Sequence, residues 1–402
     1  MRSWPITLLA LGCFAAGLLL VSARDGRGQG RDGRDRDFRR LDAASVTSHA
    51  LPRSVTAPPG NPASPQKIEL GRVLFWDPIL SGHKDVACGT CHHPRFGYAE
   101  NRDISVGVHG TGLGDQRRFA PNSSIPFVKR NSQTILNTAF NGIDDTGKYA
   151  AGRAPMFWDL RVQSLEEQAL VPLKTFEEMR GDAYGEDAAV AQVVTRLNAN
   201  AEYGRLFAGA FGGTSVTADQ IASALAAFER SLTAANAPFD RYMRGDRTAM
   251  TDAQVRGMQR FERVGCANCH SGPMFSDFTL HVLGVPDNPR VAASDSGADK
   301  TYAFRTASLR NLPLTAPYMH SGVFGSLREV LNFYDDVSGR RGGRRNPNVS
   351  REQLDPLLRQ LRDPDRQAGD IISFLEALSD ESFDRTIPKR VPSGLPPGGA
   401  IQ

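Results

Sequence analysis

Apolar positions recur with helical spacing along much of the chain, and a capping-box pattern marks where several of these segments begin. The pattern Ser/Thr-x-x-Glu/Gln predicts helix starts at Thr217, Thr251, Ser326 and Ser350. Residues 366–378 form a further amphipathic segment, whereas the alternation typical of strands is absent. The intervening stretches are rich in Gly, Pro and Asn, as expected for loops. The pattern therefore predicts a mainly α fold with long connections.

The beginning of the chain has the pattern of an export signal. Arg2 precedes an apolar run over residues 4–21, and residues 21–23 (VSA) have the small-x-small pattern that a signal peptidase cleaves. We therefore expect residues 1–23 to be a signal peptide that is removed together with Cys13, and the mature protein to be periplasmic or otherwise exported. The alternative is an uncleaved membrane anchor, because the apolar run approaches the length needed to span a bilayer.

Residues 24–40 carry most of the chain's net charge. This stretch contains seven Arg and four Asp but no aliphatic residue, so we expect a disordered leader. The formal net charge of the whole chain is +4, and most of it belongs to this leader. The rest of the chain is therefore nearly neutral. It lacks the basic footprint of a nucleic-acid-binding protein, and that class is excluded.

Four of the five cysteines fall into two identical frames. A Cys-x-x-Cys-His motif allows both thiols to bond the vinyl groups of one haem while the histidine ligates the iron. A zinc site would place its cysteine pairs much closer in sequence, and a thioredoxin-like pair would need a βαβ context. We therefore predict two covalent c-type haems. The two motifs are Cys88-Gly-Thr-Cys91-His92 and Cys266-Ala-Asn-Cys269-His270.

The position of these motifs divides the mature chain into two cytochrome c-like domains, each with one haem. We expect an N-terminal haem domain over residues 41–245 and a C-terminal haem domain over residues 246–385. The boundary precedes the helix predicted to begin at Thr251. Residues 386–402 are rich in Pro and Gly and predict a flexible tail.

Residues 70–378 resemble the bacterial di-haem cytochrome c peroxidase family, which includes the MauG-type enzymes. The resemblance rests on several segments, which together are more specific than the two haem motifs alone. The segments that carry the resemblance are LGRVLFWDPILSG, RNSQTILNTAF, FWDLRVQSLEEQALVPL, CHSGPMFSDF, SLRNLPLTAPYMHSG and SLREVLNFYDD.

The resemblance implies that the N-terminal haem reacts with peroxide and that the C-terminal haem, ligated by His270, transfers electrons. Trp158 matches the tryptophan between the haems, and Gln168 and Glu178 match the glutamine and glutamate of the peroxide pocket. On residue chemistry alone, Trp158 could be a buried packing residue, and Glu177 could act as the acid-base carboxylate as well as Glu178.

The resemblance also implies one calcium ion between the domains. Asn131, Thr315 and Pro317 match the residues that hold it, and His320 matches a histidine near the second haem. His109 lies in a Gly-rich loop where some family members place a haem ligand, and a surface histidine is the alternative interpretation.

The ligand of the second haem distinguishes two branches of the family. Classical peroxidases place a methionine fourteen positions after the residue matched by His320, whereas this chain has Tyr334 there, as the MauG-type enzymes do. A phenolate favours ferric iron and lowers the potential relative to a thioether. Met319 is the alternative ligand, and a core tyrosine is the alternative role for Tyr334.

We thus expect a di-haem peroxidase that uses hydrogen peroxide as oxidant and is MauG-like at its second haem. The alternative is a non-catalytic di-haem electron-transfer cytochrome, which would need no carboxylate such as Glu178 over an open iron. The reducing partner is a small cytochrome or copper protein in the classical enzymes, and a protein or organic substrate in the MauG-type enzymes. The sequence leaves open whether the chain forms a homodimer.

Overall fold

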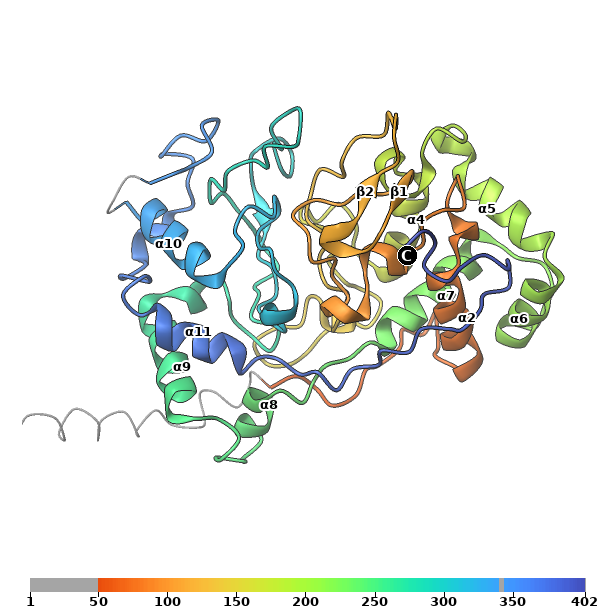
Figure 1. Ribbon diagram of the computed structural model, residues 1–402. Coiled ribbons are helices and arrows are strands. Elements are labelled where there is room, and N and C mark those ends of the chain that lie inside the picture. Colours follow the sequence, from red (N-terminus) through yellow and green to blue (C-terminus); the bar gives the residue numbers. More distant parts are fainter. Residues whose placement is uncertain (1–49, 340–342, 402) are drawn as a thin grey trace, which may run out of the picture. The chain divides into compact units, whose positions relative to one another are not determined.

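The computed structural model describes residues 50–339 and 343–401, which all belong to one compact unit (Figure 1). The predicted signal peptide, the leader and Cys13 lie outside the described residues. Among the residues that are described, no helix is long and apolar enough to cross a membrane.

The described part of the chain is mainly helical, as the pattern predicts. Its α-helices are α2 (Pro65–Trp76), α3 (Cys88–Cys91), α4 (Leu165–Lys174), α5 (Ala189–Asn198), α6 (Ala201–Phe211), α7 (Ala218–Ser231), α8 (Pro238–Met243), α9 (Asp252–Val264), α10 (Leu327–Val337) and α11 (Ala368–Glu376). Two short antiparallel pairs, β1 (Gly110–Thr111) with β2 (Arg118–Phe119) and β3 (Leu280–His281) with β4 (Phe304–Arg305), accompany them.

Three of the four predicted capping boxes form. Thr217, Thr251 and Ser326 cap α7, α9 and α10, each with the reciprocal side-chain bond from the third helical residue. The helix predicted at Ser350 is wrong. Turns follow Ser350, because Pro356 disfavours helical geometry in the residue before it, and Asp355 instead caps a short 3-10 helix.

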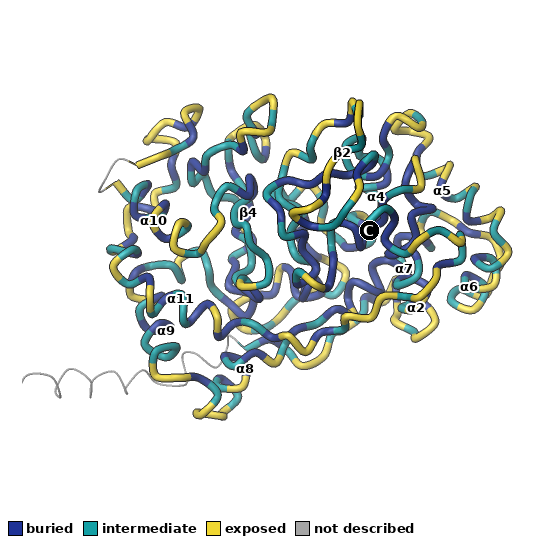
Figure 2. Tube along the Cα trace, viewed as in Figure 1, coloured by how far each residue is buried: buried dark blue, intermediate teal, exposed yellow. Residues whose placement is uncertain are grey.

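The first hydrophobic core is built on the crossing of α2 with α7, and α4 and α6 pack around this pair. A Cβ atom on Gly71 would lie 2.0 Å from the backbone oxygen of Ala224, so the two helix backbones touch at this point. The rings of Phe75 and Phe228 meet edge to face beside the crossing, with centroids 5.1 Å apart. Figure 2 shows α2 and α7 buried where they meet, while much of α5 and α6 is exposed.

The second hydrophobic core repeats this arrangement with α9 and α11. A Cβ atom on Gly257 would lie 1.9 Å from the backbone oxygen of Asp370. Phe261 and Phe374 pack edge to face across the pair, with centroids 5.4 Å apart. Each haem motif is thus accompanied by one pair of helices that cross in close contact at a glycine.

The tail predicted to be flexible is instead packed against the first core (Figure 1). Val391 is 1% exposed and belongs to that core. The backbone N–H of Gly398 donates to the oxygen of Trp76 at 2.7 Å, and the oxygen of Gly398 accepts from the Thr90 hydroxyl of the first haem motif at 2.8 Å. Composition suggested a loose tail, but its backbone groups are satisfied by partners about 300 residues away in sequence.

We expect Gly257→Ala to lower the free energy of unfolding by about 1–3 kcal/mol, the usual cost of overpacking a tight contact. The added methyl group would have to separate α9 from the backbone of α11. Gly209→Ala is the matched control, because Gly209 lies in α6 with no atom within 4 Å of the added Cβ. It should raise stability by about 0.5–1 kcal/mol. Urea denaturation of both variants measures this, and equal effects would contradict the close crossing.

Candidate functional site

The first Cys-x-x-Cys-His motif forms the short helix α3, and His92 follows at its end. The ring Nδ1 of His92 lies 3.1 Å from the backbone oxygen of Tyr98, which can only accept a hydrogen bond. Nδ1 therefore carries the hydrogen, and Nε2 keeps a lone pair with which it can ligate a metal. Burial lowers the pKa of His92, which keeps the imidazole neutral.

The second motif repeats this geometry after α9. That helix ends at Gly265, whose φ of 101° is left-handed, and the 3-10 helix Cys266–Asn268 follows directly. The ring Nδ1 of His270 donates to the backbone oxygen of Phe275 at 2.9 Å. Burial also lowers the pKa of His270. Both histidines are thus oriented by a backbone carbonyl, with Nε2 available as a ligand.

Both haem motifs line one cavity of about 540 Å³. Burial raises the pKa of Cys88 and of Cys266 to about 12, so both side chains are neutral thiols in apolar surroundings. A neutral thioether to haem suits the same apolar surroundings. The chemistry of the donor groups therefore agrees with two covalent haems.

Gln168 and Glu178 lie on the cavity wall near the first motif. Gln168 is on α4, and its Oε1 is buried without a hydrogen-bond partner. Glu178 is in the π-helix Phe176–Arg180 that follows α4, and it lines the cavity together with Cys88 and Cys91. Burial raises the pKa of Glu178 to about 7, an effect that nearby Glu177 reinforces.

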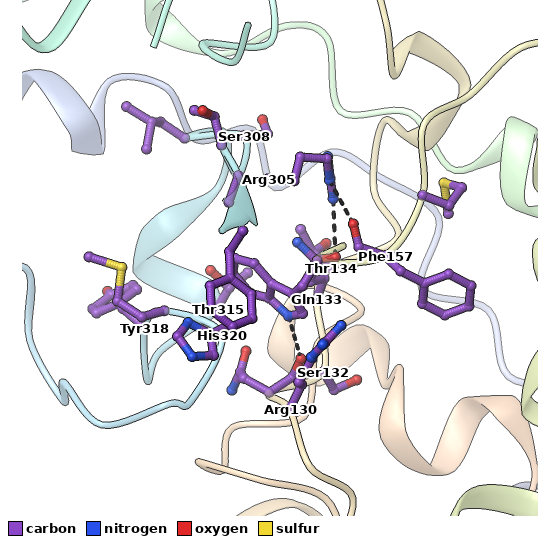
Figure 3. A pocket seen from close by; sticks show the side chains of 18 of the residues that line it. Arg130, Ser132, Gln133, Thr134, Phe157, Arg305, Ser308, Thr315, Tyr318 and His320 are labelled. Carbon is purple, nitrogen blue, oxygen red and sulfur yellow. Dashed lines mark hydrogen bonds between the residues drawn. The ribbon is translucent and has the colours of Figure 1, made fainter. Parts of the chain in front are cut away.

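Trp158 lies on the cavity wall that both motifs share. Its Nε1 donates to the backbone oxygen of Asn131 at 3.0 Å, and its ring centroid is 6.3 Å from that of His320. The backbone N–H of Arg305 donates to the oxygen of Trp158 at 2.7 Å. Figure 3 shows this region, where Arg305 also bonds the oxygen of Phe157. Trp158 is thus held both by residues before α4 and by residues of the second half of the chain.

Tyr334 is on the face of α10 that also carries Leu327, Val330 and Leu331, and all four side chains line the cavity. Burial raises the pKa of the Tyr334 phenol above its usual value. Tyr334 lines the cavity together with Cys266, Cys269 and His270. Met319 lines the same cavity, so both candidate ligands border it.

The three residues matched to a calcium site also line this cavity. Asn131 uses its side-chain Nδ2 to donate to the backbone oxygens of Arg102 and Asp103, which leaves Oδ1 as a potential ligand. Thr315 offers a hydroxyl and Pro317 a backbone oxygen.

His109 does not line the cavity. Its ring instead packs against that of His83, with centroids 4.3 Å apart. The surface interpretation of His109 therefore fits the structure better than a role as haem ligand.

Sequence reasoning missed three charged residues of the cavity wall. Glu229 on α7 has a buried Oε2 without a partner, and burial raises its pKa to about 8. Burial lowers the pKa of Arg305 to about 10. The carboxylates of Asp277 and Asp355 raise the pKa of His281 above its usual value. Glu229 could have been found, because it is a lone carboxylate within an apolar helical run.

Comparison with known proteins agrees with these observations. Residues 65–248 match the family described as di-haem cytochrome c peroxidase. The chain is 34% identical over 358 residues to the methylamine utilization protein MauG of Methylorubrum extorquens, which covers 86% of this chain and 88% of that protein. It is 35% identical over 304 residues to cytochrome c551 peroxidase of Pseudomonas aeruginosa, covering 72% and 78%. A solved MauG-like protein associated with microbial copper homeostasis superposes with a TM-score of 0.64 at 27% identity, covering 83% and 95%.

These likenesses confirm the resemblance inferred from the sequence and the fold of two cytochrome c-like domains. They favour the enzyme over a non-catalytic electron-transfer cytochrome, because the relatives are peroxidases and MauG proteins. The protein is a peroxidase-type oxidoreductase with two c-type haems, and it acts on hydrogen peroxide together with a redox partner. The chain belongs to the di-haem cytochrome c peroxidase family, which includes the MauG proteins.

Proposed function

We propose that hydrogen peroxide is reduced beside Glu178 at the first haem and that electrons pass through the second haem. The observation that carries this proposal is the partly buried carboxyl group of Glu178, which lines the cavity together with the first haem motif and has a pKa near 7. When bound, each haem supplies a redox-active iron with a histidine ligand, His92 or His270.

Glu178 is the proposed acid-base group. Cleavage of the O–O bond requires a group that takes the proton from one peroxide oxygen and delivers it to the other. A carboxyl group with a pKa near neutrality can do both, because neither of its protonation states is strongly favoured at pH 7. Gln168 lines the same cavity with an unpartnered Oε1 and would orient the peroxide by hydrogen bonding.

Trp158 is the proposed electronic bridge between the two haems. Its indole N–H donates to the backbone of Asn131 and its backbone oxygen accepts from Arg305, which holds Trp158 on the wall that both haem motifs share. Tyr334 is the proposed second ligand of the C-terminal haem iron, which makes the chain MauG-like at that haem. The position of Tyr334 on the cavity-lining face of α10 supports this assignment.

The remaining features of the proposal concern the setting of the enzyme. One calcium ion is held by Asn131, Thr315 and Pro317, and the haem domains span residues 41–245 and 246–385. The enzyme works in the periplasm after loss of its signal peptide. Tyr334 favours a protein or organic electron donor over a small cytochrome or copper protein, because a phenolate lowers the potential of the second haem.

We expect Glu178→Gln to slow the reaction with peroxide by roughly a hundredfold or more, the usual scale for a positioned acid-base group. Stopped-flow absorbance with limiting peroxide measures this rate. The wild-type rate should rise with pH through about 7, because Glu178 must be ionised to take the first proton, and the variant should lose this dependence. Glu177→Gln is the matched control. A larger loss in the control would assign the role to Glu177.

We expect Tyr334→Met to raise the reduction potential of the second haem, because a thioether in place of an anionic oxygen favours ferrous iron. Met319→Leu, which removes the alternative ligand, should leave that potential unchanged. Spectroelectrochemical titration of both variants measures it. A potential unchanged in Tyr334→Met, together with a methionine-ligation signature in the wild type, would return the protein to the classical peroxidase branch.

We expect the exported protein to have the mass of the chain from Arg24 plus two haems. Intact-protein mass spectrometry of a periplasmic extract measures both features at once. A mass that includes residues 1–23 would support the membrane anchor, and a mass with one haem would contradict the assignment of one motif.

A further inference from the structure

Three metal-ligating side chains meet on the outer side of the segment that carries Glu178. They are His83, His109 and Asp182, and one donor atom from each lies within 4.8 Å of the other two. None of the three lines the haem cavity. The side chains of His83 and Asp182 are 30% and 57% exposed, so an ion could reach the cluster from solvent.

The backbone fixes the three loops that carry these residues. Gly82 N–H donates to the oxygen of Met179 at 2.7 Å, and Val108 N–H donates to the oxygen of Glu178 at 3.0 Å. His109 has a left-handed φ of 61°, and its N–H donates to the Asp85 carboxylate at 2.7 Å. Each histidine is thus adjacent in sequence to a residue that is bonded to the segment ending at Asp182.

Two glycines permit this close approach. A Cβ atom on Gly107 would lie 2.1 Å from the backbone oxygen of Glu177, and one on Gly181 would lie 2.8 Å from the His83 ring. Gly181 also has a left-handed φ of 60°. The convergence of the three donors therefore depends on tight backbone contacts and does not arise only from flexible surface side chains.

The donor set suits a borderline divalent cation. His83 Nε2 lies 2.6 Å from Asp182 Oδ1, so an imidazole nitrogen and a carboxylate oxygen already face each other. Tetrahedral zinc with bonds near 2.0 Å needs donors about 3.3 Å apart, a spacing that side-chain rotation can reach from the observed positions. The donor set has two imidazoles and one carboxylate and no thiolate. Zinc and similar ions accept these ligands, and water would take the fourth position.

We propose that His83, His109 and Asp182 bind one zinc-like divalent cation and that the bound ion restrains the segment from Phe176 to Asp182. The ion would connect Asp182 to the two loops that already bond the backbone of Glu178 and Met179. Its importance for catalysis rests on the role proposed for Glu178. Binding of the ion and restraint of the segment do not depend on that role.

Calorimetric titration of Zn²⁺ into the mature, haem-loaded protein in calcium-containing buffer tests the site. We expect one ion per chain and at least a tenfold weaker affinity in His109→Ala and in Asp182→Asn. The asparagine can still accept a hydrogen bond from His83, so this variant should fold. Asp246→Asn is the matched control, because Asp246 is an exposed carboxylate that bonds only its own turn, and it should bind as the wild type does. Equal affinity in all proteins would overturn the proposal.

Amide hydrogen exchange with and without Zn²⁺ tests the restraint. Exchange in residues 176–182 should slow when Zn²⁺ is added to the wild type and should not change in Asp182→Asn. Zinc binding without protection of this segment would overturn the proposed restraint. Neither measurement uses peroxide, so an acid-base role located elsewhere would leave both results unchanged, and the two proposals can fail separately.

Discussion

A Cys-x-x-Cys-His motif can hold a haem only where the chain leaves a cavity beside it, and much of this structure follows from that requirement. The helices do not fill the space next to the motifs. They cross in pairs nearby, and Gly71 and Gly257 let the backbones of each pair touch. This close contact concentrates the apolar packing in α2 with α7 and in α9 with α11. Loops are then free to form the remaining walls.

The walls carry ionisable groups in surroundings where charge is costly. Burial raises the pKa of Glu178 and of Glu229 into the neutral range, because nearby cations compensate too little for the lost hydration. Arg130 contrasts with them, because it pairs with Asp159 at 2.7 Å and with Asp295 at 2.6 Å. Paired charges stabilise the connection between distant segments, and unpaired carboxyl groups remain available for proton transfer.

The segment after α4 links the cavity to the surface. Its π-helical turn directs Glu178 inward, while Asp182, four residues later, is exposed beside His83. Backbone hydrogen bonds from Gly82 and Val108 hold this turn from outside. The acid-base candidate Glu178 is therefore positioned by loops that contact solvent. A structural change on that surface can affect its carboxyl group, because only a few hydrogen bonds separate the two.

The sequence alone determined the features that depend on local chemistry. Capping boxes placed the starts of α7, α9 and α10, because each box satisfies helix N–H groups within four residues. The haem motifs are similarly local, because each is complete within five consecutive residues. The helix predicted at Ser350 failed because Pro356 outweighed a correct capping pattern.

Only the tertiary structure decided which distant residues meet. Residues 391–400 pack on the first core, although their composition resembles that of a loose tail, because partners at Trp76 and Thr90 satisfy their backbone groups. The pKa of Glu229 near 8 and the pairing of His281 with Asp355 also depend on segments that are distant in sequence. Burial and charge pairing depend on segments that are far apart in sequence, and no local pattern encodes their distance in space.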